Sequence, residues 1–295
     1  MSFTGYPPPV HLLADLGMEA VLTTHTTARV RTRVTPQVAS PGGGVRIGVL
    51  ATLVDVVGGA IAARVLHPDW LATADLAIEL VGPPVGPWVE ARGSVVRRGR
   101  TTLVIEALVV SVDADGGDVT VDGRVPEPVA WASMTFAVLP AKEPSVAAEL
   151  SADLPVHWGF RGGALDGPVL DALLVTVLDG PAGRVSVPVR PYVHNSFGAL
   201  QGGVIALLAE AAGAESLGAA QGRDGSGMVV TDLQIAYLAL GRVGPVVSSA
   251  RVLATGPDGR AGAVVELRDT GADDRLTTVV NVTAEPTDVV VGVAG

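Results

Sequence analysis

The sequence has no cysteine among its 295 residues, which excludes disulfide bonds and cysteine-ligated metal sites. It also lacks an uncharged apolar run of about 18 residues, the length needed to cross a bilayer. Asp55 interrupts one apolar segment and Glu210 interrupts the other. The first residues, MSFTGYPPPV, do not have the basic and apolar regions of a secretory signal peptide. We therefore expect a cytoplasmic protein without a membrane span.

Positive charge and metal-binding patterns are also scarce. The chain has 20 Lys and Arg against 30 Asp and Glu, and its formal net charge is −10. This balance argues against nucleic-acid binding, although a local basic patch for a small anionic ligand remains open. The histidines outside the motif described below have no metal-ligand spacing, so we expect no metal: His11, His25, His67 and His157. There is also no G-x-S-x-G nucleophile elbow.

The abundant apolar residues form a pattern that occurs twice. RVRTRVTPQVAS (29–40) aligns with RVSVPVRPYVHN (184–195), and GVLATLVD (48–55) aligns with GVIALLAE (203–210) without a gap. Asp55 therefore falls on Glu210. After a shift of two residues, ADLAIEL (74–80) aligns with TDLQIAY (231–237). Several matched blocks in the same order indicate a tandem duplication.

Each half has the same predicted order of elements. An alternating strand comes first, followed by a Gly-rich loop, a helix-length apolar segment and several strands rich in Val, Thr and Ile. This order predicts an α+β fold in which each repeat has one long helix and an antiparallel sheet. We predict domains at 1–145 and 156–295, with a linker between about Pro140 and Pro155.

The segment HNSFGALQGGVIALLAE (194–210) has the composition of a functional site. A helix that begins near Gly202 exposes backbone N–H groups at its positive end, and glycine allows a ligand to approach them. Glu210 is eight residues further along, about 12 Å at 1.5 Å per residue, and is too distant to act on the same atom. If the two equivalent helices pack antiparallel, Asp55 approaches Gly202 and Glu210 approaches the start of the first helix.

The two resulting sites are unequal in sequence. The site that faces Asp55 contains Asn195, Gln201, Gly202 and Gly203. The site that faces Glu210 contains the shorter or bulkier residues Ser40, Arg46, Ile47 and Gly48. We expect the Asp55 site to be the better one. Two structural alternatives stay open: the glycines serve only close helix packing, and the carboxylates only hold the helices in register.

These residues resemble a known family. Asn195-x-x-Gly198-x-x-Gln201-Gly202-Gly203, followed by Leu208-x-Glu210, is similar to the pattern of hotdog-fold thioesterases of the phenylacetate-pathway type. Their pattern is Asn-x-x-Gly-x-x-His-Gly-Gly and then Leu-x-Asp/Glu, so Gln201 stands where His is usual. The first half lacks the Asn, the His and one Gly. The resemblance covers nearly all of both halves and implies a double hotdog, with each long central helix wrapped by an antiparallel sheet.

The resemblance implies an acyl-CoA thioesterase that hydrolyses a thioester to the free acid and coenzyme A. Gly202 N–H would polarise the thioester carbonyl, and Asn195 would position substrate or water. Asp55 would be the nucleophile or general base, and Glu210 is its counterpart in the other site. The expected substrate-binding residues are Gln201, Gly203 and Gly198, together with Arg97, Arg98 and Arg100 for the phosphates of coenzyme A.

No separate cofactor is expected, since coenzyme A is part of the substrate. The fused pair would replace a homodimer, and further association into a homo-oligomer of fused pairs is expected. A solvated turn is the alternative interpretation of the three arginines. For the whole chain, one alternative is a non-catalytic acyl-CoA binding or sensing protein. The other is a hotdog hydratase or dehydratase, but neither helix segment contains the His that those enzymes pair with Asp.

Overall fold

The computed structural model describes residues 6–140, 153–160 and 163–287, so most of the predicted linker lies outside the described residues. The first half of the chain contains α1 (Leu12–Asp15), β1 (Glu19–Leu22), β2 (Thr27–Arg33), η1 (Pro36–Val38), α2 (Ile47–Leu66), β3 (Trp70–Leu80), β4 (Trp88–Arg98), β5 (Thr102–Val112) and β6 (Ala130–Leu139). Next comes β7 (Val156–Gly159). The second half contains α3 (Val169–Ala172), β8 (Thr176–Asp179), β9 (Arg184–Val187), η3 (Pro191–Val193), α4 (Gly202–Ala219), η4 (Gly225–Gly227), β10 (Met228–Tyr237), β11 (Val246–Thr255), β12 (Ala261–Asp269) and β13 (Arg275–Pro286).

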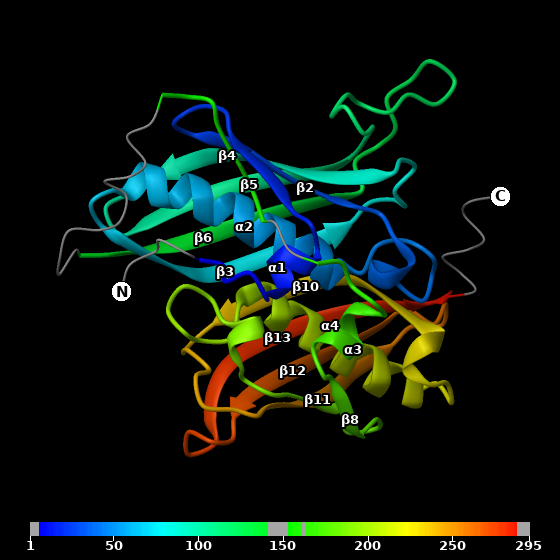
Figure 1. Cartoon of the computed structure of the whole chain (residues 1–295). Coiled ribbons are helices and arrows are strands. Elements are labelled where there is room, and N and C mark those ends of the chain that lie inside the picture. Colours follow the sequence, from blue (N-terminus) through cyan, green and yellow to red (C-terminus); the bar gives the residue numbers. More distant parts are fainter. Residues whose placement is uncertain (1–5, 141–152, 161–162, 288–295) are drawn as a thin grey trace.

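The described strands form one 13-stranded sheet in the order β7-β1-β2-β4-β5-β6-β3-β10-β13-β12-β11-β9-β8. The first half contributes β1-β2-β4-β5-β6-β3, and the second contributes the same order of counterparts, β8-β9-β11-β12-β13-β10. Figure 1 shows the first half above the second, each with its long helix against its own strands. The predicted α+β class is confirmed, and the element order recurs in both halves.

The two halves join through an antiparallel pair, β3 with β10. Ala77 lies opposite Gln234, and these two residues are counterparts in the aligned blocks ADLAIEL and TDLQIAY. A strand that pairs with its own counterpart in this way places a pseudo-twofold axis at the centre of the sheet. Both strands also have a register irregularity at equivalent points, after Thr73 in β3 and after Val230 in β10.

Helices α2 and α4 cross at their N-terminal halves and run in opposite directions. A Cβ at Gly48 would lie 2.7 Å from the Leu207 Cα, and a Cβ at Gly203 would overlap the Thr52 side chain. Thr52 and Leu207 are themselves counterparts, so the contact is symmetric. Glycine suits both positions, because a Cβ would clash with the Leu207 backbone at Gly48 and with the Thr52 side chain at Gly203. Gly203 therefore serves close helix packing, whatever further role its N–H has.

Helix α2 has the length and apolar composition of a membrane span, and it is the one helix in the described part of the chain that does. However, 61% of its apolar window is buried inside the protein. Its buried side chains, among them Leu50, Leu53 and Ile61, pack against the strands of the first half. A core helix satisfies the same criteria of length and composition, and α2 occupies that position here.

The short strand β7 pairs with β1 of the first half. Ala20 lies opposite Trp158, and Glu19 lies opposite Gly159. The predicted second repeat begins at residue 156. In the structure, β7 extends the sheet edge of the first half instead, and the second half begins its own elements at α3.

Candidate active site

The start of α4 lies against a carboxylate from the other half of the chain. A Cβ at Gly202 would be 2.7 Å from the Asp55 Oδ2 and 3.2 Å from the Tyr237 hydroxyl oxygen. Asp55 comes from the middle of α2, and Tyr237 is the last residue of β10. The predicted approach of Asp55 to Gly202 across the repeats is therefore confirmed. A side chain at position 202 would displace the carboxylate, so this glycine provides access rather than backbone flexibility.

Asp55 is held in a partly accessible, mainly apolar environment. Burial raises the pKa of its carboxyl group to about 6, although a hydrogen bond from Thr73 acts in the opposite direction. The Thr73 hydroxyl donates this bond to Asp55 Oδ1 over 3.0 Å. Oδ2 is the oxygen that faces Gly202. At neutral pH most of the population is ionised and can accept a proton, which suits a catalytic base or nucleophile.

Two backbone donors at the start of α4 lack an acceptor within the described residues. Gln201 N–H bonds to the Val193 carbonyl oxygen, and the N–H groups of Val204 and Ile205 bond back to Gln201. Between them, the N–H groups of Gly202 and Gly203 make no hydrogen bond in the described part of the chain. They sit at the positive end of an 18-residue helix. An oxygen that gains negative charge would be stabilised there.

The loop before α4 is organised by Asn195. Its side-chain Oδ1 accepts hydrogen bonds from the N–H groups of Phe197 (2.9 Å) and Ala199 (3.0 Å). The side-chain amide nitrogen is then the group that remains for a ligand. Gly198 has a φ of +70° in the same loop, a backbone conformation that favours glycine, and a Cβ there would meet nothing within 4 Å. Gly198 therefore shapes the turn and does not face the carboxylate.

Gln201 ends this loop with a buried side chain. It is 4% exposed, and its Oε1 has no hydrogen-bond partner in the described structure. A buried amide oxygen without a partner is costly in a folded protein, so its retention needs an explanation. Its position directly before Gly202 places an unused acceptor beside two unused donors. Water or a substrate N–H would satisfy it.

Glu210 also lies where the antiparallel arrangement predicts, at the start of α2, but its oxygens are occupied. Oε2 accepts a hydrogen bond from the Gly48 N–H over 3.0 Å, and Oε1 accepts one from the Arg46 guanidinium over 3.1 Å. The side chain of Glu210 is 4% exposed and that of Arg46 is 18% exposed. Burial raises the pKa of Glu210, against the opposing influence of Arg46 and of the Gly48 N–H. The Glu210 carboxylate thus caps the N-terminus of α2 and occupies the Gly48 N–H.

The difference between the two carboxylates follows from their length and surroundings. Gly48 is the counterpart of Gly203, yet only the longer Glu210 reaches the amide opposite it. The residues aligned with Thr73 and Tyr237 in the other site are Val230 and Leu80, neither of which has a hydroxyl group. The Asp55 site therefore retains free donors and polar neighbours.

The three arginines expected to bind phosphate lie apart from the carboxylate. Arg97 and Arg98 end β4, and Arg100 is in the turn before β5; all three are exposed. Their strand is connected to the site by the sheet, since Arg98 pairs with Leu103, Leu103 with Phe136 and Phe136 with Thr73. Three steps of about 4.8 Å place the Arg98 backbone roughly 14 Å from that of Thr73.

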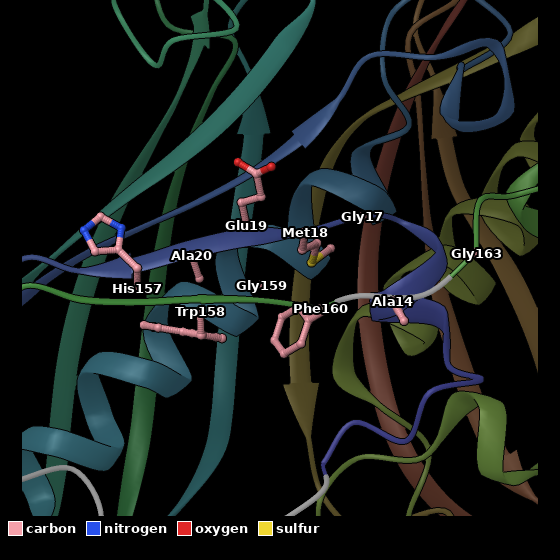
Figure 2. Close-up of a pocket in the computed structure, with 10 residues that line it drawn as sticks. All are labelled: Ala14, Gly17, Met18, Glu19, Ala20, His157, Trp158, Gly159, Phe160 and Gly163. Atoms are coloured by element: carbon pink, nitrogen blue, oxygen red, sulfur yellow. The ribbon is translucent and has the colours of Figure 1, made fainter. Parts of the chain in front are cut away.

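A cavity of about 560 Å³ lies elsewhere, along β1 and β7. Figure 2 shows its lining residues, with His157 and Trp158 on opposite sides of β7 and Phe160 beyond the strand. None of the predicted site residues contributes to its lining. It holds one carboxylate, Glu19, which is paired with Arg31. The free backbone donors and the carboxylate with a raised pKa lie at the start of α4, outside this cavity. The described residues contain no cluster of His, Asp or Glu suited to a metal ion.

Sequence reasoning missed two hydroxyl groups at this site, those of Thr73 and Tyr237. Thr73 precedes the aligned block in β3 and lies next to an irregularity in strand register that the residue pattern does not predict. Tyr237 did carry a signal, since it aligns with Leu80 at a point where the two repeats differ in polarity. Burial, with smaller contributions from the charges of Asp55 and Asp75, raises the pKa of Tyr237 well above its usual value, so its hydroxyl stays protonated.

Comparisons with known proteins agree with this geometry. Residues 43–117 and 197–267 match the family model described as the thioesterase superfamily. One segment lies in each half, and together they include Asp55, Gly202 and Glu210. The chain belongs to the thioesterase superfamily. The predicted class of enzyme, a thioester hydrolase, is thereby confirmed.

Similar solved structures share the fold of the whole chain. The tesB protein of Mycobacterium avium subs paratuberculosis has 14% identity and a TM-score of 0.59, covering 93% of this chain and 97% of its own. An acyl-ACP thioesterase from Bacteroides thetaiotaomicron has 14% identity and a TM-score of 0.54, covering 88% and 98%. The 12:0-ACP thioesterase from Umbellularia californica has 10% identity and a TM-score of 0.55, covering 88% and 94%. These likenesses show the hotdog fold of thioesterases. The comparison with curated proteins found no match.

Proposed function

We propose that the chain is an acyl-CoA thioesterase of double-hotdog form with one working active site, at Asp55 and Gly202. The observation that carries this proposal is the contrast between two equivalent helix starts. At α4, the Gly202 and Gly203 N–H groups have no acceptor in the described structure, and a carboxylate with a raised pKa faces them. At α2, the Gly48 N–H, the counterpart of the Gly203 N–H, is already bonded to Glu210, and Ile47 stands in place of Gly202.

The proposed reaction adds water to the acyl carbon and releases the thiol. The thioester carbonyl oxygen accepts hydrogen bonds from the free amides at the start of α4, which stabilise the negative charge of the tetrahedral intermediate. The Asp55 carboxylate removes a proton from water that attacks the carbon, or attacks the carbon itself to give an anhydride that water then opens. The C–S bond breaks, the thiolate takes a proton, and the acid and free coenzyme A leave.

The neighbours of Asp55 have supporting roles in this proposal. Thr73 fixes one carboxylate oxygen, so the other is presented towards Gly202. The Asn195 amide nitrogen and the buried Gln201 Oε1, which has no partner in the described structure, would position water or the amide groups of the substrate's pantetheine arm. The exposed side chains of Arg97, Arg98 and Arg100 are suited to receive the phosphates of coenzyme A, and the Arg98 backbone lies roughly 14 Å from that of Thr73.

Glu210 has a structural role in this proposal. Its two oxygens neutralise Arg46 and cap α2, an arrangement that holds the two helices together and leaves no group to act on a substrate. We also propose the phenylacetate-type subfamily, association into homo-oligomers and a cytoplasmic location. The proposed domains are 1–145 and 156–295, with β7 of the second segment paired to β1 of the first. They rest on the resemblance of the motif and on the repeated element order.

Thiol release from short, medium, long and aromatic acyl-CoAs tests the proposal, with calorimetric binding of the same compounds measured in parallel. We expect turnover of at least one class of acyl group. This turnover should persist after treatment with a chelator and without an added redox cofactor. Tight binding of an acyl-CoA without release of thiol from any compound would contradict the enzyme and support the binding protein. Release of an enoyl or hydroxyacyl product without thiol would support the hydratase.

A further inference from the structure

The N-terminal segment of the first half holds the loop of the second half that carries Asn195. The carbonyl oxygen of His194 accepts two hydrogen bonds from this segment, one from His11 Nε2 over 2.8 Å and one from the Tyr6 hydroxyl over 3.1 Å. These bonds join positions 183 and 188 residues apart in sequence. They therefore connect the start of the chain to the proposed active site.

The protonation of His11 follows from its second contact. Its Nδ1 accepts a hydrogen bond from the Leu13 N–H at the start of α1, over 3.1 Å. A ring nitrogen that accepts this bond carries no proton, so in the neutral ring the proton is on Nε2. Nε2–H then donates to the His194 carbonyl oxygen. The ring is completely buried, and Tyr6 packs edge-on against it with ring centroids 5.4 Å apart.

The peptide unit between His194 and Asn195 is fixed at both ends by these contacts. Its carbonyl oxygen is held by His11 and Tyr6, and its N–H, that of Asn195, bonds to the Ala199 carbonyl oxygen over 2.6 Å. Because a peptide unit is planar, fixing both groups sets its orientation. The orientation of this plane determines where the Asn195 side chain begins.

The equivalent loop in the first half has no such support. There, Ser40 N–H bonds to the Gly44 carbonyl oxygen over 2.6 Å, which reproduces the turn itself. The residue before α3 is Pro168, the counterpart of His11 before α1, and it has no side-chain donor. No side chain of the described residues donates to the Ala39 carbonyl oxygen, the counterpart of that of His194. Within the described residues, this pair of bonds from Tyr6 and His11, which we call the clamp, therefore occurs at the loop before α4 and has no counterpart at the loop before α2.

We propose that His11 and Tyr6 are positioning residues that hold the Asn195 loop in its catalytic geometry. This inference rests on the proposed function, because the loop matters for turnover only if Asn195 and the start of α4 meet the thioester. The residues act through the His194 carbonyl oxygen and do not touch the substrate. Tyr6 also lies within the electrostatic reach of Asp55, whose charge adds to the effect of burial in raising the Tyr6 pKa.

Two substitutions of His11 separate the clamp from the helix cap. His11→Asn keeps a side-chain oxygen that can cap α1 but is too short to reach His194. His11→Gln places an amide donor near the position of Nε2 and gives up the cap. We expect His11→Asn to lower kcat roughly tenfold with little change in KM. His11→Gln should recover most of the kcat, whatever its melting temperature.

Tyr6→Phe removes the second donor and loses only a hydroxyl group, so it provides a variant that folds. We expect its kcat to fall about two- to threefold, since His11 still holds the same oxygen. Parent-like kcat in both His11→Asn and Tyr6→Phe would overturn the proposal. So would a His11→Gln enzyme as slow as His11→Asn. If His11→Asn does not fold, the kcat of Tyr6→Phe decides.

Amide hydrogen exchange gives a test that does not depend on activity. In Tyr6→Phe and His11→Asn, the amides of residues 195–200 should exchange faster than in the parent protein. The amides of residues 40–45, in the equivalent loop, provide the internal control and should not change. If the variants leave exchange at residues 195–200 unchanged, or accelerate it equally in both loops, the clamp is refuted. If the parent releases no thiol from any acyl thioester, the proposed function fails, while the exchange experiment still decides whether the clamp exists.

Discussion

Replacement of Asp55 by Asn should stabilise the protein at neutral and basic pH while abolishing its turnover. Burial raises the pKa of Asp55 to about 6, whereas an unfolded chain has an Asp pKa of about 3.9. The ionised carboxylate therefore destabilises the folded state. Asn keeps the oxygen that accepts the Thr73 hydrogen bond and removes the charge.

The size of this effect follows from the difference in pKa. About two units at 1.36 kcal/mol each give an upper limit of roughly 3 kcal/mol. Because Asp55 is partly accessible, water screens part of this energy, and we expect a gain of about 1 to 2 kcal/mol. A carboxyl group whose pKa is raised by folding destabilises the folded state only when it is ionised. The gain should be complete at pH 8, shrink as the pH falls through 6, and vanish near pH 4.

Urea unfolding of the parent and of Asp55→Asn at pH 8, 6 and 4 measures this effect. Asp166→Asn is the matched control, since Asp166 is an exposed carboxylate that belongs to neither α2 nor α4 and should change little. A difference between Asp55→Asn and the parent that is the same at pH 4 and pH 8 would refute the reasoning. A loss of stability at pH 8 would refute it as well.

Three further predictions concern the same site. Thr73→Val removes a hydrogen bond that lowers the Asp55 pKa, so the acidic limb of the pH dependence of kcat/KM should move upward, by about one unit; a downward movement would contradict the assignment. Gly202→Ala places a Cβ 2.7 Å from the Asp55 Oδ2 and should lower kcat about a hundredfold with circular dichroism unchanged, whereas full activity would exclude the close approach that we describe. Replacement of Arg97, Arg98 and Arg100 together by Gln should raise KM for an acyl-CoA and leave KM for an acyl-N-acetylcysteamine, which has no phosphates, unchanged; equal effects on both thioesters would place the arginines outside phosphate binding.

The repeat made much of the fold predictable. Apolar periodicity, the Gly-rich loops and the aligned carboxylates gave the two long helices and their antiparallel approach. The predicted start of the second helix near Gly202 agrees with α4. The strand with which β7 pairs was not predictable, because pairing at a sheet edge depends on which edge is open in three dimensions. Periodicity alone does not distinguish the two halves as partners for a four-residue strand.

The inequality of the two sites was predictable only in part. Ile47 and Ser40 indicated a weaker first-half site from sequence, but the occupation of Glu210 by Arg46 and the Gly48 N–H did not follow from residue types. It depends on one additional methylene group, which lets Glu reach an amide that Asp does not reach in the other site. The support of His194 by Tyr6 and His11 joins residues too distant in sequence for any local pattern to connect.

The central claim is that one carboxylate performs chemistry and its counterpart holds the helices together. Glu210→Gln keeps a side chain of the same length beside Arg46 and the Gly48 N–H and removes its charge. Thiol release by Asp55→Asn and Glu210→Gln, each measured on the acyl-CoA that the parent hydrolyses fastest, tests the claim directly. We predict a fall of at least about a hundredfold for Asp55→Asn and near-parent turnover for folded Glu210→Gln. Loss of turnover in Glu210→Gln with Asp55→Asn still active would contradict the account.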